Sequence, residues 1–268
     1  MLSAYLLVSH GSRDPRPGIA MQQIAKMVST KIDIPPEDAE KLVATAYLEL
    51  QPQPLHIQIC EFANSVLKLG REQQAASRED VILPLTGEIS VEEALANPKV
   101  NLKILPLFLL SGVHVMEDIP LELELAEKKL GANIHKIDLL PYLGTYPNFR
   151  ELFTNQETPG DATILMAHGS RRPGFSKDIE IVASRLNATA CYWAVPPNLE
   201  TTVQQLVDTG KRQIKIIPYF LFAGGITDAI ANHVEALKLQ FPGISLHLAE
   251  PLGASEDLAN LIWDLLQQ

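Results

Sequence analysis

One segment of the chain occurs twice, and this repeat constrains the fold more than any other feature of the sequence. The first copy, LLVSHGSR, runs from Leu6 to Arg13, and the second, ILMAHGSR, runs from Ile164 to Arg171. Each copy is an apolar run that ends at a histidine, which is typical of a buried strand, and the following glycine allows a tight turn. A repeat of this length and order predicts two similar structural units in one chain.

The segments around the repeat alternate between apolar runs of strand length and stretches with apolar residues every three or four positions. This alternation predicts strands and helices in turn, and therefore parallel sheets with right-handed crossovers. We expect an α/β protein of two tandem lobes, residues 1–157 and 158–268, each with a four-stranded, mainly parallel sheet flanked by helices. The lobes are expected to be related by a pseudo-two-fold axis and to face each other across a cleft. The predicted strands are 3–9, 43–48, 100–110, 134–140, 162–167, 188–193, 213–222 and 244–249.

Three further features are predicted in the first lobe, one of which departs from a plain repeat. The helix that starts near Leu55 is predicted to end near Gly70, because glycine often follows the last turn of a helix. Residues 71–100 are polar at first and have no counterpart in the second unit, so we interpret them as an insertion. The first lobe is predicted to close with a helix over residues 146–155.

Composition and charge exclude several classes of protein. The chain has 268 residues, of which 46% are hydrophobic, and its net charge is −10, which argues against a nucleic-acid partner. No apolar run approaches the roughly 18 residues needed to cross a bilayer, so we expect a cytoplasmic protein without a membrane partner. The two cysteines, Cys60 and Cys191, indicate neither a disulfide framework nor a cysteine metal site.

Three residues of the first unit are candidate metal ligands. His10, Glu49 and His114 each follow a predicted strand, and ligands of open α/β sheets bind beyond the carboxyl ends of the strands. Two imidazoles and a carboxylate suit divalent iron, cobalt, nickel or zinc better than calcium or magnesium. The alternative is that each histidine is a hydrogen-bonded structural residue, which is common at strand ends.

The comparison of the two units favours the metal site over the structural alternative. Ile226 stands opposite His114, and Trp193 stands within one residue of the position opposite Glu49. We therefore expect one complete site and one degenerate copy. His168 is predicted to be structural, or a wall of the cleft, rather than a metal ligand.

Two acidic residues next to the candidate site have two interpretations. Glu117 and Asp118 follow His114, and either could orient a metal ligand. They could equally be ordinary first-turn acids, which the helix dipole favours.

The combination of motifs resembles one known family. The segments that carry this resemblance are His10-Gly11-Ser12-Arg13, Tyr47-Leu48-Glu49, the run from Pro106 to His114, and Asp118-Ile119-Pro120. They are similar to those of the CbiX/SirB sirohydrochlorin chelatases, class II enzymes that need no ATP. These enzymes insert cobalt or ferrous iron into sirohydrochlorin during cobalamin and sirohaem biosynthesis. The resemblance covers nearly the whole chain, because the long form of the family contains two tandem units.

The resemblance implies roles for the candidate residues. His10 and His114 correspond to the metal ligands and Glu49 to their acidic partner, so catalysis is expected in the first lobe. The substrate is a tetrapyrrole with several carboxylates, and the candidate donors to these groups are Ser12, Arg13, Ser111, Gly112 and Arg171. Arg13 and Arg171 could instead be solvated turn residues.

The expected partners are small molecules. The metal is expected to be a substrate, with no permanently bound cofactor, and the fused repeat favours a monomer. The alternatives are a non-catalytic carrier of a tetrapyrrole or metal and, less favoured, a hydrolase with a histidine-bound metal.

Overall fold

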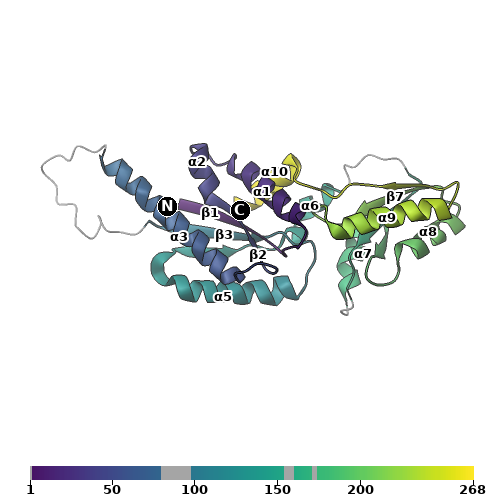
Figure 1. The fold of residues 1–268 in the computed structure, drawn as a ribbon, viewed down its shortest axis with the longest axis horizontal. Helices are drawn as coiled ribbons and strands as arrows, with labels where there is room; N and C mark the ends of the chain where they lie inside the picture. The colour runs from purple at the N-terminus through teal and green to yellow at the C-terminus, as the bar shows by residue number, and fades with distance from the viewer. Residues whose placement is uncertain (1, 80–97, 154–159, 171–173) are drawn as a thin grey trace, which may run out of the picture.

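The structure is a computed structural model, and it describes residues 2–79, 98–153, 160–170 and 174–268. Figure 1 shows an elongated molecule in which two lobes follow each other along the longest axis. Both lobes contain the predicted alternation of strands and helices. None of the described helices combines the length and the apolar character needed to cross a bilayer.

The first lobe is built around strand β1, which carries the first copy of the repeat. Helix α1 follows it and begins after Asp14, whose carboxylate accepts a hydrogen bond from the backbone N–H of Arg16. The apolar stripe of α1 at Met21, Ile24 and Val28 is fully buried. The elements are β1 (Leu2–Ser9), α1 (Pro15–Ser29), α2 (Pro36–Ala39), β2 (Val43–Tyr47), α3 (Leu55–Glu79), β3 (Val100–Pro106), α5 (Ile119–Leu130), β4 (Lys136–Leu139) and α6 (Pro147–Glu151).

The second lobe repeats this order from the second copy of the motif onward. Its helix α8 is capped by the Asn198 side chain, and α10 is capped by the Ser255 hydroxyl. The elements are β5 (Ala162–Ala167), α7 (Phe175–Arg185), β6 (Ala188–Tyr192), α8 (Leu199–Asp208), β7 (Gln213–Pro218), α9 (Gly225–Gln240), β8 (Ser245–Leu248) and α10 (Glu256–Leu266).

The two sheets have the same topology. Their strand orders are β2-β1-β3-β4 and β6-β5-β7-β8, and every neighbouring pair is parallel. In β1, Tyr5 and Leu7 enter one core cluster and Leu6 and Val8 enter another, so helices cover both faces of the sheet. The predicted fold class is therefore confirmed.

The last helix of the chain packs on the first lobe. In Figure 1 the yellow α10 lies beside the purple α1, far from the rest of the second lobe. The Lys103 ammonium group of β3 donates to the Leu266 carbonyl at 2.7 Å, and the rings of Tyr5 and Trp263 lie 5.6 Å apart. A helix of the second repeat that packs on the first lobe ties the two lobes together.

The chain just after α6, the helix that closes the first repeat, packs against the second lobe. Phe153, just after α6, lies against Tyr219 of the second lobe, with 4.9 Å between the ring centroids. The predicted boundary between residues 1–157 and 158–268 separates the two sheets in the sequence. Side chains from the two sides of this boundary nevertheless pack against each other. The boundary remains a prediction about the repeat units.

Several predicted bounds in the first lobe differ from the structure. The prediction that Gly70 ends its helix is wrong, because α3 continues to Glu79. A Cβ atom on Gly70 would lie 2.8 Å from Cβ of Pro98, so close packing explains this glycine. Residues 71–79 thus belong to α3, and the central part of the predicted insertion, residues 80–97, lies outside the described residues.

Other strands and helices are shorter than predicted. Strand β3 ends at Pro106 rather than at residue 110, because the chain then turns into the loop before His114. The helix predicted over residues 146–155 is limited to Pro147–Glu151 in the described part of the chain.

Candidate metal centre

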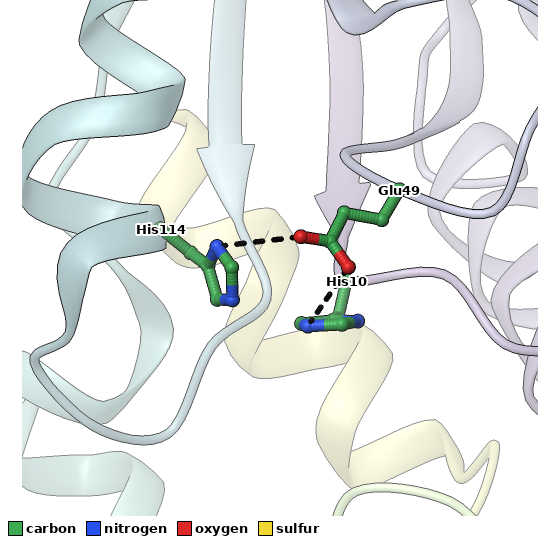
Figure 2. Close-up of side chains that lie close together, drawn as sticks. All are labelled: His10, Glu49 and His114. Atoms are coloured by element: carbon green, nitrogen blue, oxygen red, sulfur yellow. Dashed lines mark ion pairs between the residues drawn. The ribbon is translucent and has the colours of Figure 1, made fainter.

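The structure brings together the three residues expected to form the metal site (Figure 2). His10 follows β1, Glu49 follows β2, and His114 stands beyond β3, so three adjacent strands supply them. One ligand atom from each residue lies within 4.8 Å of the other two. This is the only such cluster of His, Cys, Asp or Glu side chains among the described residues.

Backbone hydrogen bonds place Glu49 beside His10. The N–H of Glu49 donates to the His10 carbonyl at 2.9 Å, which extends the pairing of β1 and β2 beyond the ends of both strands. Gly11 makes this approach possible. Its φ is +98°, and a Cβ atom there would lie 2.1 Å from the Glu49 carbonyl oxygen.

The imidazole of His10 has one nitrogen directed to the backbone of Gly11 and one to the cluster. Nδ1 lies 3.3 Å from the Gly11 carbonyl oxygen, and Nε2 lies 3.8 Å from Oε2 of Glu49. A carbonyl oxygen can only accept, so the first contact is a hydrogen bond when Nδ1 carries the proton. The lone pair of Nε2 then faces the cluster.

His114 begins a single π-helical turn, His114–Asp118, that leads into α5. Such turns are frequent at functional sites. Here the turn brings Oδ2 of Asp118 to 2.8 Å from Nδ1 of His114. An ionised carboxylate accepts, so Nδ1 donates and Nε2 is left for a ligand.

The Glu49 carboxylate lies between the two imidazoles (Figure 2). Its Oε1 is 4.0 Å from Nδ1 of His114, and the rings of His10 and His114 are 4.7 Å apart and nearly perpendicular. Ligand atoms about 2.1 Å from a tetrahedral ion are about 3.4 Å from one another. The side chains are 36–48% exposed, so small rotations suffice to close around an ion.

Two cavities meet at His10. The larger has a volume of about 670 Å³ and lies between the loop before α5 and the start of α7. The smaller has a volume of about 510 Å³ and lies between the start of α1 and the β7–α9 connection. Both lobes line each cavity, which establishes the expected cleft, and His10 is the only described residue that lines both.

The second lobe repeats the backbone hydrogen bond beside His10 but not the side chains of the site. The N–H of Ala194 donates to the His168 carbonyl at 2.8 Å, as Glu49 does to His10. The position opposite Glu49 is therefore Ala194, and Trp193 stands one residue before it. Ile226 occupies the position opposite His114 and is 37% exposed. His168 lines the larger cavity.

The predicted substrate-binding residues lie in different surroundings. Ser111 and Gly112 line the larger cavity and Ser12 lines the smaller one, where its hydroxyl accepts from the N–H of Asp14 at 3.0 Å. Arg13 is exposed and is not among the lining residues of either cavity. Arg171 lies outside the described residues.

Two contacts between the lobes were not anticipated from the sequence. The Arg16 guanidinium donates to Asp14 at 2.6 Å and, across the cleft, to Asp228 at 3.0 Å. The hydroxyl of Ser111 donates to Asp178 at the start of α7. Spacing within the chain contains no signal for either contact, since each joins residues of different lobes.

Hydrogen bonds from Arg16 are the main reason why the pKa values of its partners are low. They bring the pKa of Asp14 to about 2 and also lower that of Asp228. The same two carboxylates raise the pKa of Arg16. All three groups are therefore charged at neutral pH.

Comparison with known proteins identifies similar sequences and folds. The CbiX family model matches residues 88–158 and 162–268. A sirohydrochlorin cobaltochelatase of Priestia megaterium is 22% identical over 97% of this chain and 78% of its own length. A sirohydrochlorin ferrochelatase of the same organism is 25% identical over 66% of this chain and 71% of its own length.

A solved structure has the same architecture. The structure of SirB from Bacillus subtilis with Fe³⁺ matches 100% of this chain and 95% of its own, with a TM-score of 0.68 and 21% identity. At this identity the likeness concerns the fold. It extends over both lobes.

Proposed function

The chain belongs to the CbiX family, and we propose that it inserts a divalent metal ion, Co²⁺ or Fe²⁺, into sirohydrochlorin. The observation that carries this proposal is the cluster of His10, Glu49 and His114, in which His10 lines both cavities. The names of the two relatives from Priestia megaterium support the reaction and both metals. The ligand set suits either ion.

The two histidines would hold the ion from one side. Nδ1 of His10 faces the Gly11 carbonyl and Nδ1 of His114 faces Asp118, so each ring offers Nε2. Two protein nitrogens leave the other coordination positions of the ion open to the nitrogens of the macrocycle. Neutral imidazoles bind tightly enough to remove water from the ion, yet they can be displaced by a chelating ligand.

Glu49 would assist the departure of protons from the macrocycle. Insertion of a divalent ion releases two pyrrole N–H protons, and a base must lie within reach of them. The Glu49 carboxylate is 48% exposed and lies between the histidines. It can therefore contact both the ion and a macrocycle nitrogen, as ligand or as proton acceptor.

The carboxylates of the macrocycle would be bound at the rim of the cleft. The backbone N–H groups of Ser111 and Gly112 in the larger cavity can donate hydrogen bonds to them. We propose Arg13 and Arg171 as charged partners further out. We also propose that the protein acts as a monomer, because the two lobes of one chain already enclose the cleft.

A spectroscopic assay tests the function. Sirohydrochlorin is mixed with Co²⁺ or Fe²⁺ and a substoichiometric amount of protein, and the visible spectrum of the macrocycle is followed over time. The proposal predicts many turnovers per chain above the uncatalysed rate. A change that stops at one macrocycle per chain indicates a carrier and contradicts the proposal.

A further inference from the structure

We propose that the two substrates reach the metal centre by different routes: the macrocycle occupies the larger cavity, and the divalent ion enters through the smaller one. This inference rests on the proposed function and assigns the two cavities to its two substrates. It predicts that an ion can reach His10 while the macrocycle is already bound.

The distribution of the metal-site residues assigns the larger cavity to the macrocycle. Both His10 and His114 line it, whereas of these two only His10 lines the smaller one. A macrocycle that takes an ion from both histidines must face both of them. The larger cavity is the one that allows this.

The lining of the larger cavity also suits a flat organic ring. Its volume of about 670 Å³ lies within the usual range of small-molecule sites. The Met116 side chain lines this cavity and is 64% exposed, so it is accessible to a bound ring. The other apolar lining residues are Phe108, Leu110, Val113, Val115 and Phe175.

The smaller cavity suits a hydrated ion. Part of its lining consists of side chains with oxygen atoms, which can replace or bind the water around a cation; these are Ser9, Ser12, Asp14, Gln22, Tyr47, Gln51 and Thr227. Six water molecules at about 30 Å³ each occupy about 180 Å³. The cavity volume of about 510 Å³ therefore admits the ion with its hydration shell.

The charged groups at the smaller cavity favour the approach of a cation. Asp14 lines it, and the adjoining group of Asp14, Asp228 and Arg16 has two negative charges and one positive charge. The resulting net charge of about −1 attracts a divalent cation. A macrocycle in the larger cavity would block the approach of an ion to His10 from that side. An ion that arrives after the macrocycle would therefore use the smaller cavity.

Two glycines provide a matched test. Gly112 lines the larger cavity and Gly225 the smaller one, and a Cβ atom on either would meet no atom within 4 Å. Gly112→Phe and Gly225→Phe should therefore each fill one cavity without a backbone clash. Ile226→Trp, which also narrows the smaller cavity, is a second variant in case Gly225→Phe does not fold. Circular dichroism and thermal unfolding establish folding before any kinetics.

The readouts are macrocycle affinity without metal, Co²⁺ affinity without macrocycle, and single-turnover insertion in both orders of addition. Gly225→Phe should slow insertion at least about tenfold when the macrocycle is bound first. With Co²⁺ bound first its insertion rate should equal that of the wild type, and its macrocycle affinity should be unchanged. Gly112→Phe should weaken macrocycle binding at least about tenfold and leave Co²⁺ affinity unchanged.

Two outcomes overturn the inference. One is a wild-type rate for both Gly225→Phe and Ile226→Trp when the macrocycle is bound first. The other is a loss of macrocycle affinity in these variants as large as that in Gly112→Phe. Failure of the wild-type protein to insert metal at all would instead contradict the proposed function, so the two failures are distinguishable.

Discussion

Asp118 and His114 form the shortest contact at the metal centre, with Oδ2 of the carboxylate 2.8 Å from Nδ1 of the imidazole. The π-helical turn His114–Asp118 creates this contact. In the second lobe, α9 begins directly at Gly225, and Ile226 and Ile230 occupy the corresponding positions. The orienting carboxylate and the histidine are thus absent together from the second lobe.

Asp118→Ala should weaken metal binding. Loss of a carboxylate that orients a metal-bound histidine typically costs about 10- to 100-fold in affinity. Asp118→Asn should fall between this variant and the wild type, because its amide oxygen can still accept from Nδ1. Titration with Co²⁺, followed in the visible spectrum, measures the affinity. Glu124→Ala, at an exposed position of α5, is the control, and equal affinity in Asp118→Ala and this control would contradict the role.

Gly11→Ala should disrupt both the fold and the site. The new Cβ atom would meet the Glu49 carbonyl at 2.1 Å, and the φ of +98° is unfavourable for alanine. We expect a loss of at least about 2 kcal/mol in the free energy of unfolding and weaker Co²⁺ binding. Gly112→Ala has open space around its Cβ position and should retain both the unfolding free energy and the Co²⁺ affinity. Similar unfolding curves for the two variants would refute this explanation of Gly11.

The ion pairs of Arg16 with Asp14 and Asp228 should stabilise the folded protein above about pH 4. The pKa of Asp14 is lowered from 3.8 to about 2, and a carboxylate with a lowered folded-state pKa stabilises the fold above its unfolded pKa. This contribution is lost as the pH falls through the folded-state value. The difference in Tm between the wild type and Asp14→Asn should be constant from pH 7 to 5 and vanish near pH 2. A difference that is the same at pH 5 and pH 2 would rule out this linkage.

The C-terminal helix should determine the stability of the first lobe. Ile262 of α10 is fully buried in the core cluster that contains Tyr5 and Leu7 of β1. Ile262→Ala should cost about 2–5 kcal/mol in urea-induced unfolding, and both lobes should unfold in one transition. Leu239→Ala, at a position 85% exposed on α9, should cost little. An Ile262→Ala protein that is as stable as the control would show that α10 contributes little to this core.

The sequence was most informative where a regular pattern determines the structure. The two copies of the His-Gly-Ser-Arg segment predicted the doubled sheet, and the alternation of strands with helices predicted that the strands run parallel. The same reasoning predicted that His10, Glu49 and His114 share one edge of the sheet, because the carboxyl ends of parallel strands lie together. Their roles as ligands and base remain predictions.

Features that depend on contacts between distant segments could not be predicted. Gly70 has the local pattern of a helix end, but a glycine is needed there because the side chain of Pro98, distant in the sequence, packs against it. The contact of Arg16 with Asp228 and the packing of α10 on the first lobe likewise have no local signature. Asp118 was open to two interpretations because spacing alone does not reveal a π-helical turn.

The central claim is that the metal site of the first lobe alone carries out insertion. The most direct measurement is the kcat for Co²⁺ insertion into sirohydrochlorin by His10→Ala, His114→Ala and His168→Ala at saturating substrates. We predict that the first two variants fall below about 1% of the wild-type value, since a loss of about 2.7 kcal/mol is a hundredfold in rate. His168→Ala should keep its kcat within about threefold, although its KM for the macrocycle can rise. An equal loss of kcat in all three variants would contradict the claim.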